Sequence, residues 1–271
     1  MISMGGSSRQ SLAALRSSLD SSLKGASSGD CSHLSSDLFS ALGALESSAG
    51  LRRALTDPAR DVAAKSNLVS DLFKSVLKGP ALALLTQAAG LRWSSPADFA
   101  DAIEQLAVEA EAAAANSENK LDSLLDELFG FSKSLVENPD LRSALTNSGD
   151  TLARKVELMK SIFGAKFGSH TISLITQIVS GRSGRSIEKT LSAHIHAVTA
   201  RRNRVNAFIS TAIPLTNVQQ EKLAASLTKK IGQAVHLNIN IEPSVIGGIS
   251  NAQFCWTVIE DFNRHGHPTR Y

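Results

Sequence analysis

The feature that most constrains the fold of this chain is an internal repeat, in which two stretches of sequence match without a gap. The segment LRRALTD begins at Leu51 and LRSALTN begins at Leu141, so the two copies are offset by 90 residues. The same register aligns Lys65 with Lys155, and polar identities of this kind arise by chance less easily than matched leucines do. Further matches in this register are Phe39 with Phe129, Thr86 with Thr176, Gln87 with Gln177 and Arg92 with Arg182.

The repeat predicts a duplicated helical module that covers residues 31–106 and 121–196. In both copies, apolar residues recur at the spacing that places them on one face of an amphipathic helix. These residues are Leu34, Leu38, Leu42 and Leu45 in the first copy, and Leu121, Leu124, Leu128, Phe131 and Leu135 in the second. Stripes of this kind mostly pack in a core. The alternative is that one stripe stays partly exposed and binds a partner helix.

Three pairs of residues have the form expected at a helix start, with a capping side chain before a proline at the first helical position. They are Asp57-Pro58, Ser95-Pro96 and Asn138-Pro139. The second pair opens an alanine-rich segment, and we expect a long helix over 96–116. At about 1.5 Å per residue this helix would be on the order of 30 Å long. We expect it to end the first module and begin the second.

The pattern changes after about residue 203. Residues 205–213 alternate between apolar and other side chains, as a strand does, and VHLNINI (235–241) alternates in the same way. Between these segments, Thr216 and Gln219 have the spacing of a capping box at the start of a helix. The sequence therefore predicts two helical copies followed by a small α/β domain.

Composition and motifs argue against several classes of function. The chain has 28 Lys+Arg and 25 Asp+Glu, and a net charge of +3 is small for a protein that neutralises phosphates. The residues contain no phosphate-binding loop, no zinc-protease motif, no nucleophile elbow and no paired cysteine motif, so we expect no catalysis, cofactor or metal. The cluster of Arg201, Arg202 and Arg204 leaves open a helical-repeat adaptor or RNA-binding protein, although such a cluster is more often the solvated end of a helix.

Residues 210–249 resemble the C-terminal signature of the delta subunit of F-type ATP synthases, a family also called the oligomycin-sensitivity-conferring protein. Residues 119–200 are similar to the six-helix N-terminal domain of that family, and the repeat extends the likeness to 7–106. Some bacterial members carry an extra copy of the helical domain, which this chain also resembles. The family-motif residues in the C-terminal segment are Ser210, Pro214, Leu215, Gly232, Pro243, Gly247 and Gly248.

The sequence departs from the family pattern after Ile249, where it reads SNAQFCWTVIEDFNRHGHPTRY. The family continues with a strand, a Gly-Asp turn and a final amphipathic helix. This tail has no Gly-Asp turn and no leucine. We interpret it as a divergent ending or as an altered reading frame.

The resemblance implies a mainly α fold, with two tandem six-helix bundles that share a long linking helix and a small α/β domain after them. The implied boundaries are 1–106 for the extra N-terminal bundle, 96–203 for the second bundle with helix 96–116 in common, and 204–271 for the α/β domain. It also implies a non-catalytic subunit of the peripheral stalk, at the cytoplasmic face of the cell membrane. Its partners would be the N-terminal helices of the alpha subunits and the b-type stalk subunits, with no nucleic acid and no membrane span.

For the partner helix we expect a groove in the second module, between the long helix and the helix that carries Leu174, Ile175 and Ile178. The candidate contact residues are Ala110, Ala114, Leu174 and Ile178. The competing interpretation is that these four side chains are simply part of the core.

Overall fold

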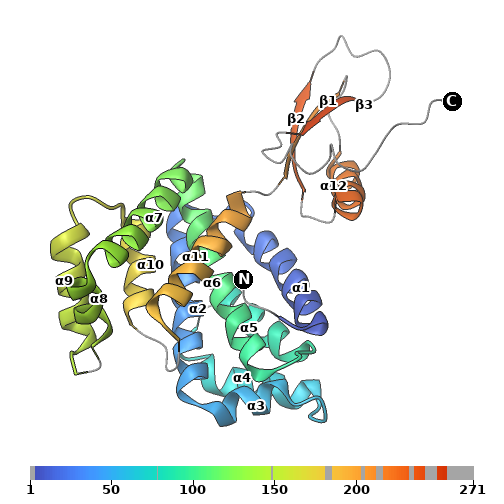
Figure 1. The fold of residues 1–271 in the computed structure, drawn as a ribbon. Helices are drawn as coiled ribbons and strands as arrows, with labels where there is room; N and C mark the ends of the chain where they lie inside the picture. Colours follow the sequence, from blue (N-terminus) through green and yellow to red (C-terminus); the bar gives the residue numbers. More distant parts are fainter. Residues whose placement is uncertain are drawn as a thin grey trace, which may run out of the picture. The chain divides into compact units, whose positions relative to one another are not determined.

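A computed structural model describes residues 4–77, 79–147, 149–180, 185–202, 205–211, 216–231, 235–241 and 249–254 of the chain. Its contacts divide the chain into two compact units, Met1–Arg201 and Arg202–Tyr271. The described part of the first unit is helical, and the second unit contains strands and a helix (Figure 1). The prediction of a mainly α protein is therefore confirmed.

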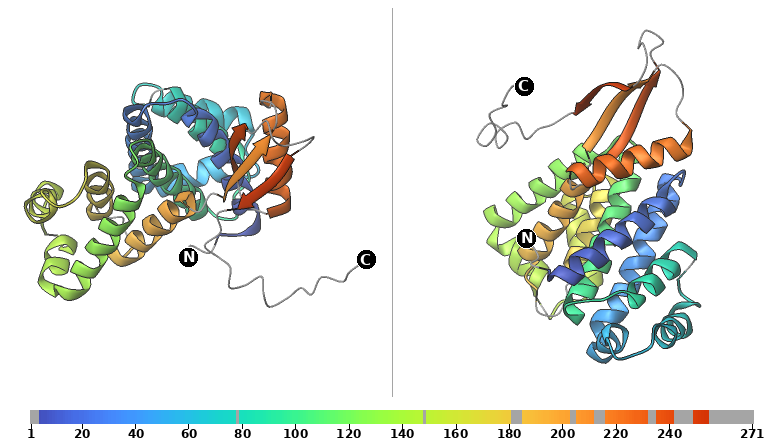
Figure 2. Two further views of the ribbon diagram at one scale, coloured as in Figure 1. Left: turned by 90° about the horizontal axis from the view of Figure 1, so that it is seen from above. Right: turned by 90° about the vertical axis from the view of Figure 1, so that its right-hand side faces the viewer.

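The described residues of the first unit form a series of helices. In chain order these are α1 (Gly6–Leu23), α2 (Ser28–Ser47), α3 (Ala49–Thr56), α4 (Val62–Phe73), α5 (Gly79–Gly90), α6 (Pro96–Ser117), α7 (Leu121–Glu137), α8 (Pro139–Thr146), α9 (Leu152–Phe163), α10 (Ser169–Val179) and α11 (Ile187–Arg202). The α3–α4 pair and the α8–α9 pair lie at opposite ends of this unit (Figures 1 and 2).

The sequence repeat is also a repeat of helix boundaries. Helix α8 begins and ends 90 residues after α3, and α9 begins and ends 90 residues after α4. Corresponding helices also pack alike, since α1 contacts α5 as α6 contacts α10, and α2 contacts α5 as α7 contacts α10. At this offset α6 is the counterpart of α1, and α11 is the counterpart of α6. Helix α6 therefore occupies the last position of the first copy and the first position of the second.

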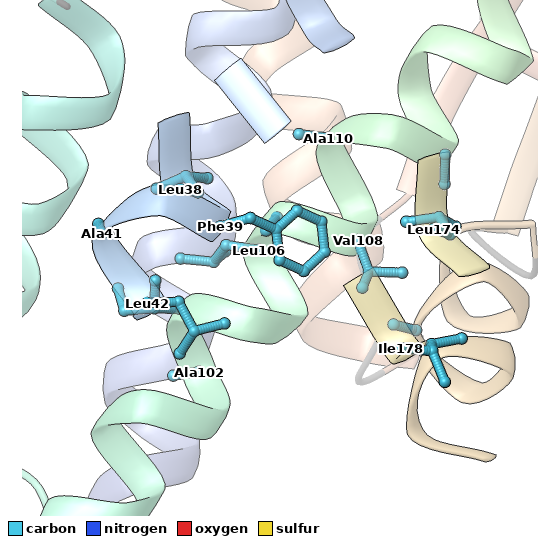
Figure 3. Close-up of a cluster of buried hydrophobic side chains, with 14 of the residues drawn as sticks. Leu38, Phe39, Ala41, Leu42, Ala102, Leu106, Val108, Ala110, Leu174 and Ile178 are labelled. Carbon is cyan, nitrogen blue, oxygen red and sulfur yellow. The ribbon is translucent and has the colours of Figure 1, made fainter. Parts of the chain in front are cut away.

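Helix α6 lies in the middle of the hydrophobic core. Its alanine-rich sequence contains few bulky side chains, and α2 can therefore pack closely along it. The core is continuous across both copies, because side chains of α2, α6 and α10 belong to one cluster (Figure 3). The largest fully buried side chains on α6 are Phe99, Ile103 and Leu106.

A sharp turn separates α6 from α7. Asn119 has a φ of 57°, in the left-handed region that asparagine tolerates better than most residues with a side chain. The N–H of Lys120 donates to the carbonyl of Ala115 at 2.8 Å, and the N–H of Asn119 donates to that of Asn116 at 3.0 Å. These bonds satisfy carbonyl groups at the end of α6, as a left-handed helix cap does.

The start of α6 is capped as the sequence predicts. Ser95 Oγ accepts a hydrogen bond from the N–H of Asp98 at 3.1 Å, and Pro96 is the first residue of the helix. The Asp98 carboxylate in turn accepts from the N–H of Gly5 at 3.2 Å, which ties the chain before α1 to α6. Burial alone raises the pKa of Asp98, but hydrogen bonds from Ser8, Ser95 and Gly5 lower it below its ordinary value.

The other two proline pairs differ from each other. Pro139 opens α8 as predicted, although no capping bond from the side chain of the preceding residue is formed. The prediction at Asp57-Pro58 is wrong, because Asp57 ends α3 and the next helix begins only at Val62. The Asp57 side chain accepts from the N–H of Ala59 at 2.9 Å, and it therefore stabilises a turn instead of a helix start.

The second unit contains β1 (Val205–Thr211), α12 (Asn217–Ile231), β2 (Val235–Ile241) and β3 (Ile249–Phe254). The strand order is β2-β1-β3, with β2 parallel and β3 antiparallel to β1. Helix α12 makes the crossover that a parallel strand pair requires. The capping box at its start is formed. The N–H of Thr216 donates to Gln219 Oε1 at 2.9 Å, and the N–H of Gln219 donates to Thr216 Oγ1 at 3.4 Å.

Candidate partner-binding surfaces

The four residues expected to contact a partner helix are all buried, but they do not share one surface. Ala114 of α6 packs with Cys31 of α2 and Leu23 of α1, in a smaller cluster separate from the core that contains Ala110, Leu174 and Ile178. Ala110, Ala114 and Leu174 are 0% exposed and Ile178 is 3% exposed. Leu174 and Ile178 of α10 belong to the continuous core, as Ala110 of α6 does (Figure 3). In this structure they are core residues, and their contact with a partner helix stays a prediction.

Helix α6 also carries three buried carboxylates that sequence reasoning missed. Glu104, Glu109 and Glu111 are 2%, 1% and 3% exposed. Because an isolated buried charge is strongly unfavourable, each of them needs a charged or hydrogen-bonding partner. Glu109 has Arg16 of α1, whose Nε and Nη2 atoms both lie 2.7 Å from its Oε1 atom. Glutamates on the buried faces of an alanine-rich helix are the signal that could have indicated such pairs.

Glu104 joins α6 to α11 and to the segment before it. Its Oε2 atom lies 2.6 Å from Arg185 Nη1, and its Oε1 atom lies 3.0 Å from His194 Nε2. Arg185 Nη1 also lies 3.1 Å from Asp101 Oδ1. Burial by itself lowers the pKa of Arg185, but the charges of Glu104 and Asp101 outweigh it and raise this pKa above its ordinary value.

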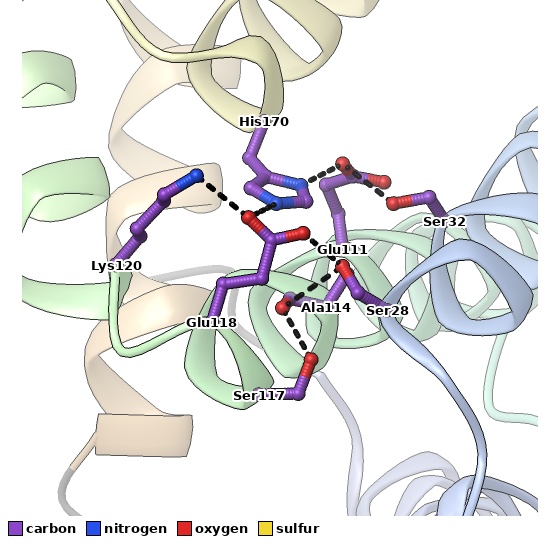
Figure 4. Close-up of polar contacts among 8 residues, drawn as sticks. All are labelled: Ser28, Ser32, Glu111, Ala114, Ser117, Glu118, Lys120 and His170. Carbon is purple, nitrogen blue, oxygen red and sulfur yellow. Dashed lines mark hydrogen bonds and ion pairs between the residues drawn. The ribbon is translucent and has the colours of Figure 1, made fainter.

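Glu111 joins α6 to α10 and α2 (Figure 4). His170 Nδ1 lies 2.7 Å from Glu111 Oε1, and Ser32 donates to the same oxygen at 3.2 Å. The other ring nitrogen of His170 lies 3.5 Å from a carboxylate oxygen of Glu118. Glu104, Glu109 and Glu111 thus tie α1, α2, α10 and α11 to one helix, so both copies are held by polar contacts as well as by the core.

Glu118 lies at the end of α6, where the two copies meet. It accepts hydrogen bonds from Lys120 Nζ at 2.7 Å and from Ser28 Oγ at 2.6 Å (Figure 4). The hydrogen bond from Lys120, followed by the one from Ser28, lowers the pKa of Glu118 to about 2. The carboxylate is therefore charged at any physiological pH.

One open pocket lies between α7 and α11, with a volume of about 390 Å³. Phe129 of α7 lines it and is 55% exposed, which is unusual for a phenylalanine in a folded domain. Sequence alone does not single out this residue, because it lies beside the buried stripe of α7 and its exposure depends on where α11 packs. The other lining residues include Ser132, Ser192, Ile195, His196 and Thr199.

The family-motif residues lie in the second unit. Ser210 is in β1, beside Asn240 of β2 in the strand register. The other six, Pro214, Leu215, Gly232, Pro243, Gly247 and Gly248, lie outside the described residues. In the part of the chain that the structure describes, no helix is both long and apolar enough to cross a membrane.

Comparison with known proteins gives a consistent result. The profile of the family described as "ATP synthase delta (OSCP) subunit" matches residues 103–251. That match ends two residues after Ile249, where the sequence departs from the family pattern. The chain is 38% identical to the "ATP synthase subunit delta" of Streptomyces coelicolor over 249 residues, which cover 92% of this chain and 90% of that protein. It is 35% identical to the subunit of the same name from Thermobifida fusca, over 91% of each chain.

A further relative of the same name, from Kineococcus radiotolerans, is 35% identical over 90% of this chain and 88% of its own length. The matches to these full-length relatives cover both helical copies as well as the C-terminal unit, so the extra copy is a shared feature and not an isolated insertion. Subunits of this family are non-catalytic components of the peripheral stalk of F-type ATP synthases. The chain belongs to the ATP synthase delta (OSCP) subunit family.

Proposed function

We propose that this chain links the F1 catalytic head to the membrane-anchored b-type subunits and so keeps the head from turning with the rotor. In this proposal the helical unit binds the N-terminal helices of the alpha subunits, and the C-terminal unit binds the b-type subunits. The assembly lies at the cytoplasmic face of the cell membrane. The observation that carries the proposal is the 38% identity to a delta subunit over 92% of the chain.

We assign the helical unit as two tandem six-helix modules, α1–α6 and α6–α11, followed by a small α/β domain from residue 204. The equal helix boundaries in the two copies support this assignment, as does the position of α6 in both. Long helices packed around a continuous core suit a part that transmits force between two attachments. We propose the domain limits 1–106, 96–203 and 204–271.

Co-purification tests this function. The tagged full chain is mixed with purified F1 heads from the same organism, and separately with heads whose alpha subunits lack their N-terminal helices. We expect the chain to bind the intact heads and not the truncated heads. We expect it to bind the soluble part of the b-type subunits whichever heads are present. A chain that binds neither partner would contradict the proposal. The rival RNA-binding function gains no support from the comparisons, and it would show as salt-dependent retention on a polyanion.

The four candidate contact residues are a finer proposal. Ala110, Ala114, Leu174 and Ile178 would touch a partner helix only if the helices packed over them moved, because they are at most 3% exposed. An Ile178→Asp variant should lose binding to an alpha-subunit N-terminal peptide. Since a buried aspartate can unfold the protein, Ile178→Ala is measured beside it, with circular dichroism as the check on folding. A folded variant with unchanged binding would exclude this contact.

A further inference from the structure

We propose that His170 forms a proton-dependent clasp with Glu111 and Glu118, which holds the start of α10 against the end of α6 when both ring nitrogens carry a proton. His170 is the second residue of α10 and is 7% exposed. Its Nδ1 atom lies 2.7 Å from Oε1 of Glu111, and its Nε2 atom lies 3.5 Å from Oε2 of Glu118 (Figure 4). A carboxylate oxygen therefore faces each nitrogen of a single buried ring.

A neutral imidazole satisfies only one of these two contacts, because it has one N–H group and one lone pair. When its proton is on Nδ1 and is donated to Glu111, the lone pair of Nε2 faces a carboxylate oxygen of Glu118. This nitrogen is buried and makes no hydrogen bond to a described residue, which is unfavourable for a polar atom. A second proton, on Nε2, replaces that repulsion with an attraction between opposite charges. The two carboxylates therefore select the charged form of the ring.

The charge of Glu118 is constant over the pH range in which the clasp works. Hydrogen bonds from Lys120 and Ser28 hold the pKa of Glu118 at about 2. An imidazole ordinarily changes charge between about pH 5 and 8. Within that range the carboxylate stays ionised and fixed in place, so the charge that changes is that of the ring.

The groups that other helices bring to this site do not replace the ring proton. From α7, Glu127 accepts a hydrogen bond from the N–H of Gly168 at 2.8 Å, just before α10 begins. From α2, Ser32 donates to Glu111 at 3.2 Å. Burial raises the pKa of the nearby Cys31 thiol above its ordinary value of 9.0, so this thiol stays neutral. Because the contact with Glu127 remains, we expect loss of the ring proton to free the first turn of α10 from α6 without unfolding the unit.

The first helical copy has no equivalent of the clasp. At the 90-residue offset, its three members correspond to Pro80, Ser21 and Ser28. None of these side chains changes its charge between pH 5 and 8. Helix α5, the counterpart of α10, therefore serves as an internal control within the same molecule.

The clasp has a consequence for partner binding, and this consequence rests on the proposed function. Leu174 and Ile178 lie on α10 and are at most 3% exposed. A partner could reach them only if the helices packed over them moved. Release of the start of α10 at higher pH would favour such a movement, whereas a charged His170 opposes it.

Amide hydrogen exchange of the full chain, corrected for the intrinsic effect of pH on exchange, tests the clasp. As the pH rises, protection of the α10 amides should fall by up to about tenfold per pH unit, the limit set by release of one proton. Protection of α5 should change much less. Nitrogen NMR of the histidine rings should show both nitrogens of His170 protonated while α10 is protected, and one proton lost over the same pH range in which protection falls. A ring with a single proton while α10 is protected would overturn the proposal.

Three variants separate the clasp from a merely structural role. His170→Gln cannot take up a proton, so its α10 protection should no longer depend on pH. In Glu118→Gln the amide N–H can donate to a neutral Nε2 atom, so protection should persist as the pH rises. Glu127→Gln is the matched control, because it weakens the same helix end without touching the ring, and it should lower protection while the pH dependence remains.

The proposal is overturned if His170→Gln and Glu118→Gln keep the pH dependence of the unaltered chain. The same holds if α5 loses protection with pH as α10 does. All of these measurements use the chain alone. Their failure would therefore leave the binding of F1 heads, and with it the proposed function, as a separate result.

Discussion

The two copies should respond very differently to loss of the same phenylalanine. Phe39 and Phe129 occupy equivalent positions, but they are 7% and 55% exposed. A phenylalanine side chain buries about 200 Å², and the exposures differ by about half of that area. At about 25 cal/mol per Å², this difference amounts to about 2.5 kcal/mol. We therefore expect Phe39→Ala to lower the free energy of unfolding by about 3–5 kcal/mol, and Phe129→Ala by about 1–2 kcal/mol.

Urea unfolding with tryptophan fluorescence can measure this difference in the helical unit alone. Trp93 packs edge-on against the ring of Phe99 of α6, 5.4 Å between centroids, and therefore reports on that unit. The other tryptophan, Trp256, is removed from all samples by Trp256→Phe, so that one signal remains. Equal losses of stability at the two positions, within about 0.5 kcal/mol, would refute the argument that the burial of each phenylalanine sets its contribution to stability.

Three other substitutions test the caps and the buried charges. Asp98→Asn should lower the melting temperature at pH 7. Because the folded pKa of Asp98 lies below its ordinary value of 3.8, that difference should fade as the pH falls below 3.8. Asn119→Gly should leave the free energy of unfolding unchanged or raise it. Asn119→Val should lower it by about 1–2 kcal/mol, measured by urea unfolding, because valine disfavours a positive φ. Arg185→Met should lower the free energy of unfolding by about 3–5 kcal/mol, because it leaves Glu104 with too little positive charge. Adding Glu104→Gln should recover part of that loss in a double-mutant cycle.

Much of the helical unit could be predicted from local sequence because the repeat and the helix periods are local signals. The 90-residue offset anticipates the matched bounds of α3 with α8, and the Ser95 cap anticipates the start of α6. Asp57 shows the limit of such rules, because a residue that favours helix caps favours turns by the same hydrogen bond.

The sites could not be predicted in the same way, because they depend on which helices meet. The pairing of Glu104 with His194 joins residues 90 positions apart, and no local sequence pattern around either residue predicts the other as its partner. Phe39 and Phe129 are identical in sequence and equivalent in the repeat. Helix α2, which carries Phe39, packs along α6, and His194 of α11 contacts the Phe39 ring, whereas Phe129 is exposed. Their difference is therefore a property of tertiary structure.

In the proposed arrangement of two modules, the place of α6 in both has a mechanical consequence. Two modules joined by a flexible linker would bend at the linker under torque, and little of that torque would pass from one module to the other. Here the connection is itself a 22-residue helix, which packs against side chains from both copies. A twist applied to either copy is carried directly into the other, and neither can melt without removing a helix from its neighbour. Lengthening the array in this way adds five helices for each copy and leaves no hinge between copies.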